Sequence, residues 1–210
     1  MMQMMKVMKM TMNGTGRKAA RRALALAALA CVTLASASPA LALGKRRFIE
    51  LCRSGDAREL RAELERDKDF VRSWLDDEGE TPLMKASEEA RSPEIIEALL
   101  AAGANVNDQD DDGETALMYA MDDYADIQIV RALLAGGADV SLEDEEGRTA
   151  LMHALKEHAG PDVILALLDA GAAVNARDYL GHSVLDYARR SRRLQGTEVL
   201  RRIEEESRQN

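Results

Sequence analysis

Aromatic side chains are scarce in this sequence, where Phe, Trp and Tyr make up only 3% of the 210 residues. A single three-dimensional core of this size usually contains more of these large side chains, because they fill much of the volume. Ala, Leu, Met and Val supply most of the apolar 46%. Stacked helix pairs need only small and medium side chains between their layers, so the composition favours a helical array over a globular enzyme.

Cysteine is almost absent as well, with Cys31 in the N-terminal segment and Cys52 beyond it. A single thiol in the body of the protein cannot form an internal disulfide. We expect Cys52 to be a small apolar residue on a buried helix face. A reactive thiol would need a basic neighbour such as His, and the sequence assigns none.

Acidic residues are missing from residues 1–42, which contain six of the 28 basic residues: Lys6, Lys9, Arg17, Lys18, Arg21 and Arg22. The rest of the chain therefore has 22 basic against 37 acidic residues, a net charge of −15. Most of this charge lies in residues 76–157, where 5 basic and 22 acidic residues give −17. So acidic a body would repel the phosphate backbone, which argues against nucleic acid as a partner.

The acid-free start has the order of a secretory signal. A basic, Met-rich region (1–22) precedes an apolar stretch (23–34), and small residues follow up to Ala40-Leu41-Ala42. This order predicts a signal peptide over residues 1–42, with cleavage after Ala42. The mature chain, residues 43–210, is then expected in an exported compartment, either the periplasm or the medium, without stable insertion in a membrane.

Three other interpretations of this segment stay open. An uncleaved membrane anchor would need a longer apolar run than the one that Pro39 interrupts. A lipid attached to Cys31 would need a Leu ahead of Ala28-Leu29-Ala30, and that Leu is missing. An organelle transit peptide would also be Arg-rich and acid-free, but amphipathic rather than apolar on all sides. The pair Arg21-Arg22 suggests a twin-arginine export signal, although the residues around it match poorly, and Met8, Met10 or Met12 is an alternative start.

The rest of the chain repeats itself every 34 residues. Glycines recur at this interval at Gly79, Gly113, Gly147 and Gly181. The segments after them align without gaps and begin Glu80-Thr81-Pro82-Leu83-Met84, Glu114-Thr115-Ala116-Leu117-Met118, Arg148-Thr149-Ala150-Leu151-Met152 and, in a weaker copy, His182-Ser183-Val184-Leu185-Asp186. Leu-Leu pairs and a second set of glycines, Gly103, Gly137 and Gly171, keep the same period. A fixed period of this length indicates a stack of similar helical units.

Each unit has the pattern of two helices followed by a turn. Thr81 and its copies are suited to cap a short first helix, on which Leu83 and Ala86 share one face. A second helix begins near Glu94, Ile127 or Asp162, runs through the Leu-Leu pair, and ends at a left-handed glycine of the second set. The Asp-rich stretch that closes each unit predicts a turn or hairpin that projects from the stack.

This unit strongly resembles the ankyrin repeat, a unit of about 33 residues with the motif T-P-L-H-x-A. The resemblance covers about residues 45–207 and implies an all-α solenoid of about five stacked helix-turn-helix units with short hairpin projections. It divides the chain into an N-terminal cap repeat (45–78), three full repeats (79–112, 113–146 and 147–180) and a C-terminal cap (181–207). The His of the motif is replaced by Met84, Met118, Met152 and Asp186, so we expect its hydrogen bonds between repeats to be lost.

No catalytic or metal-binding pattern accompanies the repeat. The three histidines lack the spacing of a metal site, and we expect them at the surface or in packing. Asp108, Asp110 and Asp112 resemble the start of a calcium loop, but Tyr119 stands where that loop requires a bidentate Glu. The sequence has no nucleophile elbow, phosphate-binding loop or dinucleotide fingerprint. We therefore expect no enzymatic activity, no metal and no cofactor.

The resemblance also implies where a protein partner binds, since ankyrin proteins commonly use hairpin tips and the exposed surface of the first helices. The corresponding residues are acidic in the first three units and change character in the last: Asp77, Glu78, Glu80, Glu88, Asp111, Asp112, Glu114, Asp122, Asp123, Glu145, Glu146, Tyr179, Leu180 and His182. Asp76, Asp110, Asp144 and Asp178 are expected to belong to the turn itself. We expect a monomer that binds a basic protein as an adaptor or inhibitor. The alternative is a passive structural or protective protein whose acids only keep its surface soluble.

Overall fold

The computed structural model describes residues 39–209, except residues 68, 74, 76 and 122–124. The chain divides into two units, residues 1–42 and 43–210, and the fold described below is that of the second unit. Apart from the backbone of residues 39–42, the predicted signal peptide lies outside the described residues.

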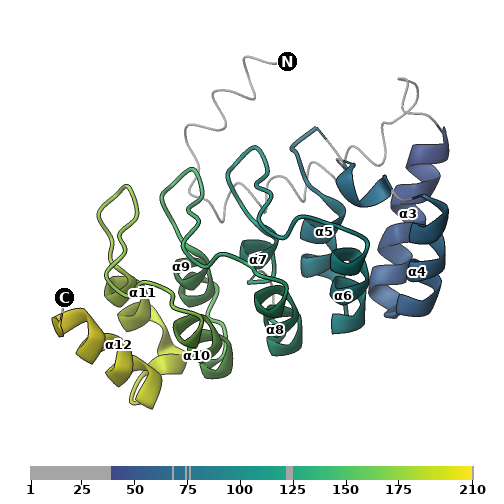
Figure 1. The fold of residues 1–210 in the computed structure, drawn as a ribbon. Coiled ribbons are helices and arrows are strands. Elements are labelled where there is room, and N and C mark those ends of the chain that lie inside the picture. The colour runs from purple at the N-terminus through teal and green to yellow at the C-terminus, as the bar shows by residue number, and fades with distance from the viewer. Residues whose placement is uncertain (1–38, 68, 74, 76, 122–124, 210) are drawn as a thin grey trace. The chain divides into compact units, whose positions relative to one another are not determined.

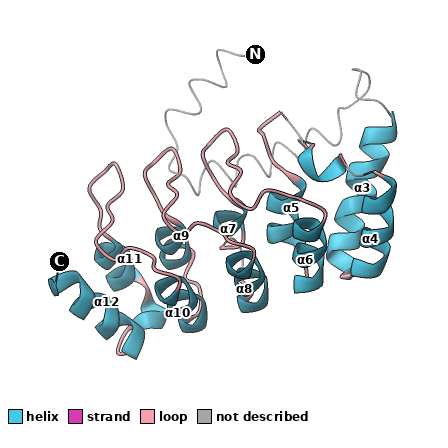
Figure 2. Cartoon of the chain, in the orientation of Figure 1, coloured by secondary structure: helices cyan, strands magenta, loops and turns pink. Residues whose placement is uncertain are grey.

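The described residues form ten α-helices and no strand, in five consecutive pairs (Figures 1 and 2). The pairs are α3 (Pro39–Ser54) with α4 (Ala57–Arg66), α5 (Pro82–Glu89) with α6 (Pro93–Ala101), α7 (Ala116–Tyr119) with α8 (Ile127–Ala135), α9 (Ala150–Lys156) with α10 (Pro161–Asp169), and α11 (Val184–Arg190) with α12 (Glu198–Gln209). Two short 3-10 helices, η1 (Phe70–Arg72) and η2 (Arg192–Leu194), lie in the two terminal units. The all-α solenoid of about five units expected from the repeat is confirmed.

The helices are stacked in two layers. The first helices of successive pairs pack on one another in the order α5, α7, α9 and α11, and the second helices pack in the order α4, α6, α8, α10 and α12 (Figure 1). From α5 onward, each first helix also packs on the second helix of its own pair. The main contacts thus join neighbouring units, which is the arrangement of a repeat solenoid.

The core between the layers is continuous and built from medium-sized side chains. Leu83, Leu117 and Leu151, one per unit, are at most 1% exposed. The three Met residues that follow them are buried to the same degree, which explains how the fold manages with few aromatic side chains. Cys52 is also fully buried, and burial raises the pKa of its thiol to about 12, as suits an unreactive core residue.

The helix starts follow the sequence pattern with one exception. The hydroxyls of Thr81 and Thr115 accept hydrogen bonds from the backbone N–H groups of Met84 and Met118. Thr149 occupies the same capping position, but among the described residues its buried hydroxyl has no partner. Capping by Thr149 was therefore a wrong expectation.

The second helices end as the glycine pattern predicts. Gly103, Gly137 and Gly171 have φ angles of 94°, 87° and 93°, in the left-handed region that other residues rarely adopt. After them the chain forms three hairpins that project from the helices, closed by isolated bridges from Gln109 to Thr115, from Glu143 to Thr149 and from Arg177 to Ser183.

Candidate functional site

The three hairpins are each held at the base by one buried Asp. Asp110, Asp144 and Asp178 are 3–8% exposed. One oxygen of each carboxylate accepts hydrogen bonds from the backbone N–H groups two and four residues later, at 2.8–3.0 Å. These Asp residues therefore belong to the turn, as expected, and are not available to a partner.

A backbone ladder joins the tips of successive hairpins. In each case a backbone N–H of one tip donates to a carbonyl of the preceding tip: Asp111 N to Glu78 O at 3.0 Å, Glu145 N to Asp112 O at 2.8 Å and Tyr179 N to Glu146 O at 2.9 Å. The tips approach so closely that a Cβ on Gly147 would lie 2.5 Å from the Tyr179 ring. The φ of Gly147, 74°, also lies in the left-handed region, so both the close contact and the backbone conformation require glycine here.

Acidic side chains occupy the same step of this ladder in three consecutive tips. We name Asp77, Asp111 and Glu145 the acidic tip row; all three are exposed. Their neighbours Glu78, Asp112 and Glu146 are half-buried. In the fourth tip the same two steps hold apolar side chains, Tyr179 and Leu180, which are 73% and 82% exposed.

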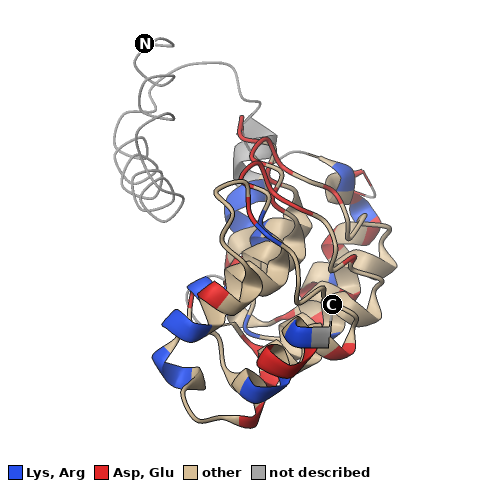
Figure 3. Ribbon diagram, turned by 90° about the vertical axis from the view of Figure 1, so that its left-hand side faces the viewer, with Lys and Arg blue, Asp and Glu red and all other residues tan. Residues whose placement is uncertain are grey.

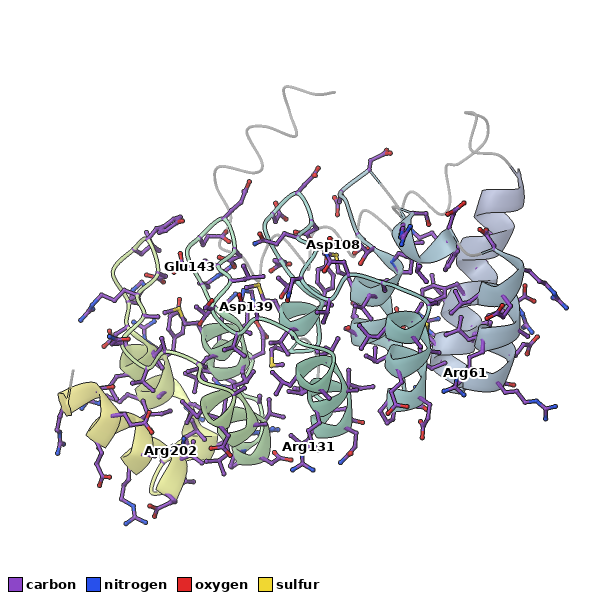
Figure 4. All side chains as sticks on the ribbon, in the orientation of Figure 1. Arg61, Asp108, Arg131, Asp139, Glu143 and Arg202 are labelled. Atoms are coloured by element: carbon purple, nitrogen blue, oxygen red, sulfur yellow. The ribbon has the colours of Figure 1, made fainter. Side chains whose placement is uncertain are left out.

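Labelled acidic and basic side chains lie at different levels of the stack. Asp108, Asp139 and Glu143 lie in the loops and hairpins (Figure 4). Arg61, Arg131 and Arg202 lie on the second helices, away from the hairpins (Figure 4). The view from the C-terminal end likewise shows acidic residues along the hairpins and basic residues gathered at its lower left (Figure 3). The acidic tip row therefore faces solvent on the hairpin side of the stack.

Glu114 does not belong to this surface, and its assignment as an exposed binding residue was wrong. It is only 3% exposed. Its Oε1 lies 3.9 Å from Nε2 of His153 in the following repeat. The residue after the period glycine is already at the base of the hairpin, where the next repeat covers it.

The acids at the ends of the first helices are neutralised locally. Glu88 is half-buried and pairs with Lys85 at 2.6 Å. Its neighbour Glu89 pairs with Arg53 of the N-terminal unit at 2.8 Å. Asp122 and Asp123, the copies of these acids in the next repeat, lie outside the described residues. The candidate acidic surface is thus narrower than the sequence suggested, and it lies at the hairpin tips.

Two further predicted residues are partly used inside the protein. Glu80 is half-buried, and the Tyr119 hydroxyl lies 3.4 Å from its Oε1. His182 is half-buried too, with its Nδ1 3.0 Å from Asp178 Oδ2. Both lie beside the tips rather than on them.

An ion-pair network lies under the hairpin of Asp144. Asp144 Oδ2 accepts from His153 Nε2 at 2.8 Å and from Arg148 Nε at 2.8 Å. Arg148 also reaches Glu146 at 2.6 Å. Burial raises the pKa of Asp144, but the hydrogen bonds and positive charge of His153 and Arg148 outweigh burial and hold that pKa below its usual value.

The same place brings together three possible metal ligands. Single ligand atoms of Glu114, Asp144 and His153 all lie within 4.8 Å of one another. The Arg148 guanidinium, however, lies 2.7 Å from the Asp144 oxygen that would bind the ion. A divalent cation would have to displace this buried cation or lie beside it, so we describe the cluster as an ion-pair network and not as a metal site.

Hydrogen bonds expected to be lost with the motif His are supplied by the next residue in the chain. The hydroxyls of Tyr119 and Tyr187 donate to Asp110 and Asp178, each at 2.7 Å, and His153 does the same for Asp144. The sequence contained the signal, because a polar residue follows the Met or Asp of the motif in every copy. In three of the four copies, the residue after the motif position thus bonds the Asp at the base of the hairpin.

Comparison with known proteins agrees with this architecture. Within the described residues, no helix is both long and apolar enough to cross a membrane. A search of curated protein sequences finds no significant match. A family model described as ankyrin repeats, in three copies, matches residues 49–143, 83–178 and 122–207. These matches span the helical stack from the first unit to the last, and the chain belongs to the ankyrin-repeat family.

Proposed function

We propose that this protein binds a basic protein partner through the acidic tip row and acts as an adaptor or inhibitor in an exported compartment. Ankyrin repeats are protein–protein interaction modules, so the class of function follows from the family. The basic character of the partner is our inference. It depends on one observation: exposed carboxylates occupy the same step of three successive, hydrogen-bonded tips, at Asp77, Asp111 and Glu145.

Electrostatics supports this choice of partner. Like charges in register on adjacent tips repel one another, and solubility alone does not require them to lie on one side. A basic surface would relieve the repulsion and would be steered toward the row over about one screening length, roughly 8 Å at physiological ionic strength. Because the tips are joined through their backbones, the carboxylates are presented at fixed spacing.

The last tip is suited to a different role in the same complex. Tyr179 and Leu180 are the only large apolar side chains that are exposed among the described residues. Apolar side chains of this kind contribute most when a partner removes them from water. We assign association to the acidic tip row and slow dissociation to this apolar tip.

The export of the protein is part of the proposal. It is supported by the order of basic, apolar and small residues in the segment 1–42. Mass spectrometry of the N-terminus of the native protein tests it. We expect the chain to begin at Leu43. An intact segment 1–42 on a cytoplasmic protein would contradict export.

Binding kinetics test the surface. The partner is obtained by co-purification from the exported fraction and immobilised for surface-plasmon measurements. Reversing Asp111 and Glu145 to Lys should slow association by about tenfold or more at low salt, and by less at high salt. Replacing Tyr179 and Leu180 with Ala should instead speed dissociation by about tenfold.

A matched control separates the row from net charge. Reversing Glu97 and Glu205, which are exposed on the second helices, changes the total charge by the same amount. This variant should associate as fast as the wild type. If it is slowed as much as the tip variant, overall charge and not the acidic tip row attracts the partner. Binding that is insensitive to salt and to both variants would favour the passive protective protein instead.

A further inference from the structure

Inside the stack, two side chains of one hairpin loop, Asn107 and Gln109, hold the next repeat, whereas Ser141, the copy of Asn107, binds Asp139 of its own loop. Asn107 Nδ2 donates to Gly137 O at 3.2 Å, and Asn107 Oδ1 accepts from Asp139 N at 2.8 Å. Gln109 Nε2 donates to Glu143 O of the following repeat at 2.9 Å. These two positions are therefore devices for stacking one unit on another.

The last loop has Asn175 and Arg177 at the same two positions, but no further repeat of the described chain is stacked on them. Asn175 is the copy of Asn107 two periods later, and its side chain is exposed and has no hydrogen-bond partner among the described residues. Arg177 is the copy of Gln109. It donates to Gly181 O of its own hairpin at 2.8 Å, as Gln109 does to its own, and no second described acceptor is in reach. Leu180 O, the next carbonyl of the tip ladder, likewise accepts from no described backbone N–H group.

An apolar position at the same end is also incompletely covered. Leu185 is the copy of Leu117 and Leu151, which are 1% and 0% exposed, but Leu185 itself is only half-buried. A pocket of about 310 Å³ lies beside it. The pocket is lined by Val174, Asn175, Arg177, Ser183, Leu185 and Ser207, so α12 borders this surface without filling it.

We propose that the hairpin half of the C-terminal end is a docking site for an extended segment of another protein, whose backbone pairs with Asn175 and Leu180 while an apolar side chain covers Leu185 and a carboxylate meets Arg177. The end faces the viewer in Figure 3. One internal interface shows the expected register, because the loop of the following repeat occupies the equivalent surface on Asn107 and Gln109. Adding a strand-like segment to unpaired backbone groups is an established mode of peptide recognition.

A second copy of the chain does not fit this role. To continue the stack it would offer its N-terminal unit, where Leu75 is the copy of Glu143. The Leu75 carbonyl already accepts from Lys45 Nζ at 2.8 Å. Nearby, residues 70–72 form the 3-10 helix η1 in place of an open loop. The occupant is therefore a different polypeptide.

Charge indicates the sequence of that segment. Arg177, Arg189 and Arg190 are exposed at this end. Arg189 already pairs with Glu204 at 3.2 Å, so the charge offered to a partner is that of Arg177 and Arg190. Asp178 is buried under its hairpin, and Asp186 binds the N–H and hydroxyl of Ser183. A segment with an acidic residue next to an apolar one is complementary to this site. The docking site is thus opposite in charge preference to the acidic tip row, and it shares only Leu180 with the apolar tip.

Selection from a library of random linear peptides tests the proposal on the full chain. We expect enriched peptides to contain an apolar residue beside Asp or Glu. Asn175→Ala should weaken their binding about tenfold, the loss expected for two hydrogen bonds to a bound backbone. Arg177→Gln keeps a donor for Gly181 O, as Gln109 shows, and removes only the charge. It should weaken acidic peptides but not their amide counterparts with Asn or Gln.

Matched variants decide between docking and stability. Asn107→Ala should lower Tm by about 2–4 °C without changing peptide affinity, because Asn107 holds the protein's own next repeat. Asn175→Ala should change affinity and leave Tm unchanged. Reversing Asp111 and Glu145 to Lys should not weaken these peptides, so failure here is separable from failure of the acidic tip row. The proposal is overturned if no peptide is enriched, if enriched peptides ignore both Asn175→Ala and Arg177→Gln, or if Asn175→Ala lowers Tm as much as Asn107→Ala.

Discussion

The hairpins of Asp110 and Asp144 have the same backbone structure, but the buried carboxylate is stabilised differently in each. In both, a buried Asp accepts two backbone N–H groups of its own turn. Asp110 receives in addition only the neutral hydroxyl of Tyr119, and burial raises its pKa. Asp144 receives His153 and Arg148, which hold its pKa below the usual value despite burial.

The difference arises from two positions, since Glu114 and Tyr119 in one repeat are replaced by Arg148 and His153 in the next. The backbone geometry alone therefore does not decide how a buried carboxylate is stabilised. The hairpin of Asp144 depends on ionic partners. In the hairpin of Asp110 the neutral donors favour the ionised acid, but they do not outweigh burial, which raises the pKa.

The largest expected effect is that of Asp144→Asn at neutral pH. We expect it to lower the free energy of unfolding by about 3 kcal/mol, because it leaves the buried Arg148 guanidinium with Glu146 as its one remaining ion-pair partner. Asp110→Asn keeps the acceptor oxygen and removes an unfavourable buried charge, so its effect should stay within about 1 kcal/mol. Urea unfolding followed by circular dichroism measures both. Equal losses would show that the two hairpins are stabilised alike.

The pH dependence of these two variants should separate them next. The lowered pKa of Asp144 stabilises the fold above the unfolded value of about 3.9, and this contribution is lost only as pH falls below it. The raised pKa of Asp110 acts in the opposite direction: stability present below about pH 4 is lost as pH rises through the folded pKa. The difference in the free energy of unfolding between wild type and Asp110→Asn should therefore change with pH above pH 4. The corresponding difference for Asp144→Asn should change below pH 4. Unfolding free energies measured from pH 3 to pH 7 test the two windows; a shared window contradicts the comparison.

Tyr119→Phe should have a smaller effect, about 1–2 kcal/mol, because it removes the one side-chain donor from buried Asp110. Tyr187→Phe is the matched change in the last hairpin. It should lower the free energy of unfolding by less, since His182 remains 3.0 Å from Asp178. Thermal unfolding of the two variants measures the difference. If Tyr187→Phe is the more damaging, the number of remaining donors does not govern these sites.

The smallest effects are expected at the tips. Asp111→Ala and Glu145→Ala should change the free energy of unfolding by no more than about 0.5 kcal/mol, because both side chains are exposed and the tip ladder uses only their backbones. Thermal unfolding at low and high salt checks this. A loss as large as that of Tyr119→Phe would mean that these side chains stabilise the fold and are not reserved for a partner.

Most of the fold could be predicted from the sequence. The period fixed by Gly79 and its copies located all the hairpins, and the Leu-Leu pairs with Gly103 and its copies located the ends of the second helices. These features depend on residues within one unit or in adjacent units, so the repeat period is enough to predict them. Capping by Thr149 failed although its φ and ψ, −88° and 166°, match those of Thr81 and Thr115, and nothing in the structure explains the difference.

The surface was predicted less well than the fold. A repeat pattern treats Glu80, Glu114, Arg148 and His182 as equivalent positions, yet two of them are buried and two are half-buried. Burial of Glu114 depends on His153 of the next repeat, a contact that no single unit contains. The unoccupied Asn175 was missed for the same reason, since its significance appears only when Asn107 is seen holding a neighbour.

The backbone ladder between tips has a consequence for how such a protein changes in evolution. Each rung joins a carbonyl to an N–H 33 residues later, whatever the side chains are. Deleting residues 113–146 would remove Glu145 and leave Tyr179 N facing Asp112 O. The rung would be the same, formed by a different pair of residues. A gene that gains or loses one whole period therefore keeps the ladder continuous with one rung more or fewer, while the row of charges grows or shrinks by one carboxylate at a time.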